Sequence, residues 1–252
     1  MSGHSKWSTI KRQKGAADAK RGALFTKLGR EISLAAREGG GDPNANFKLR
    51  LIVDKARAAN MPKENMERAI KRGTGELKGE SEIEITYEGY GPNGVAVLVK
   101  VVTDNRNRAA AEVRRAFTRH GGSLGELGCV GWMFEPKGYM AITLEEDQDP
   151  DEVAMSAIDA GADDVSPYKE TVEVYTKVED FQWVRESLEK RGLQLGDQEP
   201  IWMSPKTLMK LDEKDTLQAM SLIDELEELE DVSQVFTNLD ISDEVMEKYQ
   251  AE

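Results

Sequence analysis

Cysteine, histidine and long apolar runs are scarce in this chain of 252 residues, and each scarcity excludes a class of protein. A single cysteine, Cys129, permits neither an intramolecular disulfide nor a cysteine-rich zinc site, and its apolar neighbours predict a buried, inert thiol. The only histidines, His4 and His120, stand in no pattern that pairs a base with a nucleophile. The longest apolar run, Val95 to Val99, is far shorter than the roughly 18 residues of a membrane span. The N-terminus also lacks the apolar core of a signal peptide. We therefore expect a cytoplasmic protein that is not an enzyme, needs no cofactor and does not bind membranes.

An acidic segment from Glu145 to Ser166 holds nine acidic residues and no lysine or arginine. Its first aspartates follow the opening spacing of a calcium-binding loop. The sixth position of such a loop holds Glu152 in place of glycine, and the twelfth holds Ile158, which cannot ligate a cation. We therefore predict no metal site, and interpret the segment as a solvated face with acids near a helix N-terminus.

Charge is distributed unevenly along the chain. Residues 1–75 hold 17 Lys+Arg and 7 Asp+Glu, a net charge of +10, whereas residues 76–252 hold 17 and 40, a net charge of −23. The two values sum to the −13 of the whole chain. Such asymmetry indicates a basic segment that meets a polyanion and an acidic body that does not. The alternative is that the two parts neutralise each other within the molecule.

The basic residues are densest at the N-terminus, where residues 1–30 hold eight lysines and arginines against one acid, Asp18. Such a cluster favours contact with phosphates. The flat ring of Trp7 suits either stacking on a base or packing on the protein. The candidate nucleic-acid-binding residues are His4, Lys6, Trp7, Lys11, Arg12, Lys14, Lys20, Arg21, Lys27 and Arg30.

A second basic patch is expected on one helix within the acidic body. That helix carries five arginines, Arg114 among them, and the candidate binding residues are Arg106, Arg108, Arg115 and Arg119. The last three share a helical face because they are spaced by seven and four residues. A solvated helix face without a ligand is the alternative interpretation.

Residues 1–75 are predicted to form a basic helical domain. Apolar periodicity predicts helices over Lys20 to Arg37 and Asn44 to Ala59, and a third helix in which Pro62 is the first residue and Gly73 the C-terminal cap. The glycine-rich loop from Gly39 to Pro43 is long. No pair of helices with a short turn is evident, which argues against a helix-turn-helix that reads the major groove.

The hydrophobic period changes to that of strands from residue 82 onwards. Strands are predicted over Glu82 to Glu88 and Val95 to Val102, followed by a helix from Arg106 to His120 that Asp104 can cap. The next elements form a second α+β set: Tyr139 to Leu144, Pro150 to Ala160, Thr171 to Val178, Glu179 to Arg191 and Leu193 to Met203. A helix from Asp212 to Leu229 and a strand from Val232 to Leu239 remain, and they can complete the sheet that begins with the strand Glu82 to Glu88.

We therefore predict an α+β multidomain protein, in which a basic N-terminal helical bundle is followed by two ferredoxin-like α+β domains. The second, 131–204, is inserted in the first, 76–130 plus 205–240.

Several motifs resemble the YebC family, which includes a mitochondrial translational activator of cytochrome oxidase. They are Gly3-His4-Ser5-Lys6-Trp7, Phe25-Thr26-Lys27-Leu28, Ala36-Arg37-Glu38-Gly39-Gly40-Gly41-Asp42-Pro43, Asn60-Met61-Pro62-Lys63, Tyr87-Glu88-Gly89-Tyr90-Gly91-Pro92-Asn93-Gly94 and Thr103-Asp104-Asn105-Arg106-Asn107-Arg108. The resemblance covers essentially the whole chain. It implies three domains, a cytoplasmic location, and either a transcriptional regulator that binds DNA or a ribosome-associated translation factor that relieves stalling at proline-rich sequences.

The sequence therefore predicts a nucleic-acid-binding regulator of gene expression, with DNA as its partner. The first alternative is the ribosomal role, with ribosomal RNA and tRNA as partners. The second is a protein-interaction adaptor, in which the acidic α+β body binds a protein partner. A monomer is expected in each case.

Overall fold

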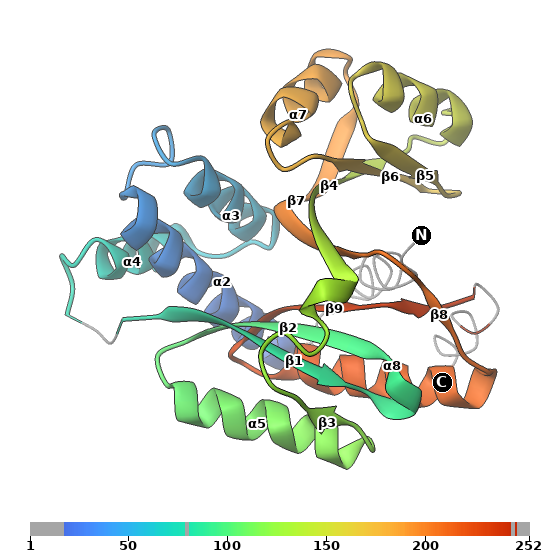
Figure 1. Ribbon diagram of the computed structural model, residues 1–252. Helices are drawn as coiled ribbons and strands as arrows, with labels where there is room; N and C mark the ends of the chain where they lie inside the picture. Colours follow the sequence, from blue (N-terminus) through green and yellow to red (C-terminus); the bar gives the residue numbers. More distant parts are fainter. Residues whose placement is uncertain (1–17, 79–80, 243–244, 246–252) are drawn as a thin grey trace. The chain divides into compact units, whose positions relative to one another are not determined.

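The computed structural model of the protein describes residues 18–78, 81–242 and 245 (Figure 1). The described chain forms two compact units. One unit is the segment Phe134–Ser204, and the other combines the described residues that precede and follow that segment.

Three helices begin the larger unit: α2 (Asp18–Gly39), α3 (Phe47–Ala58) and α4 (Lys63–Gly73). They enclose a small core of their own, in which Leu28, Ile32 and Leu49 are at most 1% exposed. Asn46 caps α3, because its side chain accepts a hydrogen bond from the Leu49 amide at 3.0 Å. The second helix therefore begins three residues later than the predicted start at Asn44.

The predicted ends of the third helix are wrong by one residue each. Pro62 is the N-cap of α4, with extended dihedral angles, and is not the first helical residue. Gly73 is the last helical residue and Thr74 the C-cap. Gly73 is needed for packing, because a Cβ atom there would lie 2.1 Å from the carbonyl oxygen of Ser33 in α2.

The connection between α3 and α4 consists of only four residues, 59–62. The expectation that no short turn joins two of the helices is therefore wrong at this point. Asn60 makes the tight turn possible by adopting a φ of 60°. However, Glu64 and Glu67 place negative charge on the first turns of α4, where a recognition helix would approach base edges.

The larger unit also holds a four-stranded antiparallel sheet in the order β3-β1-β2-β9. The strands are β1 (Ile83–Tyr90), β2 (Ala96–Thr103), β3 (Ser123–Leu124) and β9 (Val232–Thr237). Val97 pairs with Thr237, and Val99 with both Tyr87 and Val235, so a segment from the C-terminal part of the chain completes the sheet. Short elements flank these strands: η1 (Pro92–Gly94), η2 (Gly131–Met133), and the parallel pair β8 (Met209–Lys210) and β10 (Leu239–Asp240).

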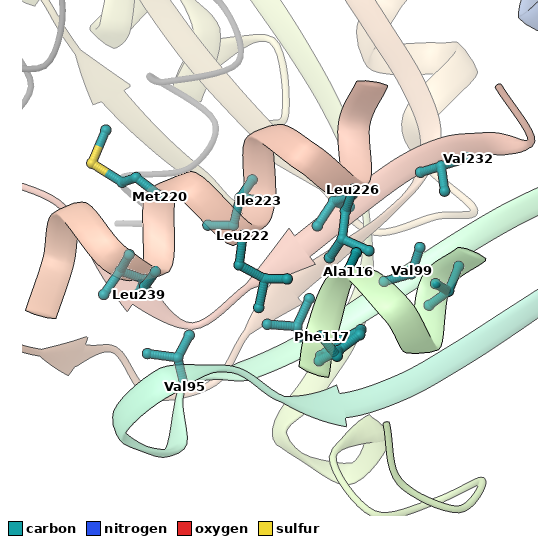
Figure 2. Close-up of a cluster of buried hydrophobic side chains, with 14 of the residues drawn as sticks. Val95, Val99, Ala116, Phe117, Met220, Leu222, Ile223, Leu226, Val232 and Leu239 are labelled. Carbon is teal, nitrogen blue, oxygen red and sulfur yellow. The ribbon is translucent and has the colours of Figure 1, made fainter. Parts of the chain in front are cut away.

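Two helices, α5 (Arg106–Arg119) and α8 (Glu213–Glu228), pack on one face of this sheet (Figure 1). Alternate residues of β2 point to them because side chains alternate along a strand. Figure 2 shows Val99 of β2 near Phe117 of α5, with Leu222 and Ile223 of α8 in the same cluster. The N-cap of α5 is Asn105, not Asp104 as predicted, since the Asn105 side chain accepts from the Arg108 amide at 3.1 Å.

The smaller unit has a sheet in the order β5-β6-β4-β7 with two helices. Its elements are β4 (Phe134–Thr143), α6 (Pro150–Asp159), β5 (Asp164–Pro167), β6 (Thr171–Thr176), α7 (Phe181–Lys190) and β7 (Gln194–Pro205). Asp149 in the acidic segment caps α6, accepting from the Asp151 amide at 2.9 Å. The predicted fold class, α+β with a helical N-terminal region followed by sheet domains, is confirmed. No helix in the described part of the chain is long and apolar enough to cross a membrane.

Candidate nucleic-acid interface

The N-terminal candidates fall into two groups. His4, Lys6, Trp7, Lys11, Arg12 and Lys14 lie outside the described residues. Lys20 lies in α2, and its side chain is likewise outside the described part. Arg21, one residue further, is exposed near the start of that helix.

Lys27 and Arg30, further along α2, bind elements of their own chain. The Lys27 ammonium donates to the carbonyl oxygen of Glu227 at the end of α8. The Arg30 guanidinium donates to the carboxylate of Glu230 at 2.9 Å and also to that of Asp231. Because the Arg30 side chain is only 12% exposed, its charge serves this internal contact and is not presented on an open surface.

Asp231 also forms an ion pair with Arg108, an arginine of the second predicted patch. Arg108 donates to its carboxylate through Nε at 3.1 Å and through Nη2 at 2.9 Å, and it contacts Asp104 at 2.8 Å. Thr103 donates to the same carboxylate at 2.9 Å. The hydrogen bonds to Asp231 and Asp104 raise the pKa of Arg108, which keeps the guanidinium charged and in place.

Arg119 and His120 both contact the carboxylate of Glu225 in α8. The Glu225 carboxylate lies 3.4 Å from Arg119 and 2.7 Å from the His120 ring. Burial raises the pKa of Glu225, but these two partners lower it more, so the net pKa lies below its ordinary value. Of the three arginines on the predicted face, Arg108 and Arg119 therefore contact acids of their own chain, whereas Arg115 is exposed to solvent.

Four other cations of the helical region have no acidic partner among the described residues; Lys55 is half-buried and the other three are exposed. Among the described residues, no side-chain hydrogen bond or ion pair is made by Arg37, Lys55, Arg68 or Lys71. None of these four residues is among the binding candidates predicted from the sequence, although they contribute to the basic excess of residues 1–75. A cavity of about 360 Å³ beside Arg37 is lined also by Arg72 and Glu82, and those two form an ion pair of 3.4 Å. The positive surface is thus spread over α2, α3 and α4.

The described residues provide little for catalysis. Cys129 is half-buried and not buried as predicted, and partial burial with the neighbouring Glu88 charge raises the pKa of its thiol, which makes it a poor nucleophile at neutral pH. Within residues 18–78 and 81–242, no group of three or more His, Cys, Asp or Glu side chains is placed to hold a metal ion. What the geometry does provide is a helical region with open cations.

Comparison with known proteins matches nearly the whole chain. Residues 5–76 match the family model of the TACO1/YebC N-terminal domain, and residues 82–239 match that of the TACO1/YebC second and third domain. A protein of Geobacter sulfurreducens is 56% identical over 98% of this chain and 99% of its own length. A protein of Dictyoglomus turgidum is 51% identical over the same shares. Both carry the name "probable transcriptional regulatory protein".

A solved structure shows the same fold. The crystal structure of a conserved hypothetical protein from Aquifex aeolicus matches with a TM-score of 0.84 and 46% identity, covering 90% of this chain and 93% of that one. The two family models, the identities and this structural match lead to one conclusion. The chain belongs to the TACO1/YebC family.

Proposed function

We propose that this protein is a nucleic-acid-binding regulator of gene expression that acts on DNA as a transcriptional regulator. The observation that carries the proposal is the division of charge, +10 in residues 1–75 against −23 in the remainder. The names of the relatives support regulation of transcription, and the basic residues 1–75 supply the means of contact with a polyanion.

The proposed contact is with the phosphate backbone. Lysines and arginines that neutralise phosphates release condensed counterions, which drives binding without reading the base sequence. The N-terminal candidates Lys6, Lys11, Arg12 and Lys14 are proposed to make this contact together with the open cations of α2, α3 and α4. The acids on the first turns of α4 argue against readout of bases by that helix, since a carboxylate near a phosphate backbone is repelled.

Two nuclease treatments separate this role from a ribosomal one. The native protein is sedimented from a cell lysate that has been treated with DNase, with RNase or with neither. We expect the protein to leave the fast-sedimenting fraction after DNase and to remain there after RNase. Release by RNase alone, with sedimentation alongside ribosomes in the untreated lysate, would instead support the translation factor.

A further inference from the structure

The outward face of α5 forms a shallow hollow on the acidic body, and the surface of this hollow is mostly apolar and carries three arginines. The hollow has a volume of about 630 Å³. It is lined by Ala110, Ala111, Arg114, Arg115, Thr118 and Arg119. The opposite face of the helix is anchored in the core through Val113, Ala116 and Phe117, each at most 1% exposed. The hollow therefore lies on a fixed helix, not on a loop.

Two arginines of this hollow, Arg114 and Arg115, lack among the described residues the acidic partners that Arg108 and Arg119 have. Arg108 and Arg119 contact Asp231 and Glu225, as described above. In the described structure, the guanidinium groups of Arg114 and Arg115 are exposed and make neither an ion pair nor a side-chain hydrogen bond. Residues 76–252 hold 40 acids and 17 bases, yet no described carboxylate forms an ion pair with these two guanidinium groups. Two adjacent positive charges without such a partner complement an anionic ligand.

The shape of the hollow suits an extended ligand. Between the arginines, the short side chains of Ala110 and Ala111 allow the helix surface to approach a ligand closely. The helix is 14 residues long, which corresponds to about 21 Å at 1.5 Å per residue. Each strand of duplex DNA carries a phosphate at every nucleotide, so neighbouring phosphates are available to the two adjacent arginines.

We propose that the hollow formed by α5 binds the phosphate backbone of duplex DNA and is a second contact, separate from the basic residues 1–75. The inference rests on the proposed function, because the hollow is proposed to bind the same ligand, duplex DNA. Arg114 and Arg115 each neutralise one phosphate. Arg106, at the first turn of the helix, is exposed and adds positive charge at the helix N-terminus. The proposed contact is independent of base sequence, because phosphate groups carry no sequence information.

The test uses the full-length protein and a fluorescent duplex DNA of arbitrary sequence. Affinity is measured by anisotropy across a range of KCl concentrations for the wild type, for R114Q/R115Q and for K190Q/R191Q. The last variant is a matched control, because it removes two adjacent exposed cations from the end of α7 in the other unit. Melting temperatures are measured in parallel; R114Q/R115Q is expected to unfold with the wild type, and K190Q/R191Q slightly lower, because it loses the hydrogen bond that Arg191 donates to Ser156 at 3.2 Å.

We expect R114Q/R115Q to bind DNA more weakly at every salt concentration, with a log–log salt slope shallower by about 1.8, or about 0.9 for each lost phosphate contact. K190Q/R191Q should match the wild type. If the wild type binds duplex DNA and R114Q/R115Q has the same salt slope as the control variant, this inference is overturned and the proposed function stands. A wild type that does not bind duplex DNA overturns both. The same titrations are repeated with duplex RNA of the same length. If R114Q/R115Q weakens binding to the RNA but not to the DNA, the assignment to DNA is overturned.

Discussion

Arg30 of α2 and Arg108 of α5 donate hydrogen bonds to the same carboxylate, that of Asp231. Asp231 precedes β9 directly, and its side chain is only 3% exposed. The buried acid therefore joins the helical region to the sheet through two arginines that are far apart in the sequence. Two positive charges around one carboxylate compensate the desolvation that burial imposes on it.

Replacing Asp231 by Asn should cost about 3–5 kcal/mol of unfolding free energy, because it leaves two arginines against a neutral amide in a largely buried site. Urea unfolding followed by circular dichroism measures this loss. Asp54→Asn is the control, since Asp54 and Arg57 form an exposed pair worth at most about 1 kcal/mol. Equal losses for the two variants would show that the Asp231 contacts contribute no more than a surface ion pair.

A second buried acid, Glu88 of β1, organises the loop that follows β3. Its carboxylate accepts hydrogen bonds from the amides of Gly128, Val130 and Gly131 at 2.7–2.9 Å. Burial raises the pKa of Glu88, but these three donors lower it more, so its pKa lies below the ordinary 4.5. The ionised form therefore stabilises the fold fully above about pH 4.5, and this contribution is lost as the pH falls through the lowered pKa.

Glu88→Gln should lower the unfolding free energy by about 1–3 kcal/mol at neutral pH, because the amide presents a single acceptor oxygen to three donors. The difference from the wild type should shrink as the pH falls below 4.5, since the wild-type carboxylate becomes protonated there. Urea titrations at a series of pH values measure both effects. A difference that stays constant down to the acid limit would refute this role of the charge.

Two glycines of the helical region should respond to alanine in opposite directions. At Gly73 an added Cβ would lie 2.1 Å from the Ser33 carbonyl oxygen and 2.9 Å from the Ala36 Cβ, so α2 and α4 would have to separate. We expect Gly73→Ala to cost about 1–3 kcal/mol. At Gly22 nothing lies within 4 Å of such a Cβ, and alanine should stabilise α2 by up to about 1 kcal/mol. Thermal unfolding of the two variants compares them, and a shift of the same sign in both would contradict the packing described here.

The fold class could be predicted from the sequence, because the spacing of apolar residues is helical in the N-terminal region and alternates, as in strands, from residue 82 onwards. Short strands were missed. β5 has four residues and β3 has two, too few to show an alternating pattern. The cap of α5 was misassigned because Asp104 and Asn105 are adjacent and both suit the position. The structure shows why Asn105 is used: Asp104 pairs with Arg108 at 2.8 Å.

The candidate site was harder to predict than the fold. Arg30 and Arg108 look like free cations in the sequence, because their acceptor Asp231 lies more than 100 residues further along the chain. Arg114 received less weight than Arg108 and Arg119, yet it is open whereas they are paired. Whether a lysine or arginine is available to a ligand depends on contacts between distant segments, which local pattern does not reveal.

The central claim is that the basic N-terminal residues bind nucleic acid through its phosphates. Its most direct test is the salt dependence of duplex DNA binding by the full-length protein, compared between K6Q/K11Q/R12Q/K14Q and K169Q/K177Q/K190Q/R191Q. Each variant removes three lysines and one arginine, the first from the N-terminus and the second from exposed positions of the smaller unit. We predict a log–log slope shallower by up to about 3.6 for the first variant and the wild-type slope for the second. Equal slopes for the two variants would contradict the claim.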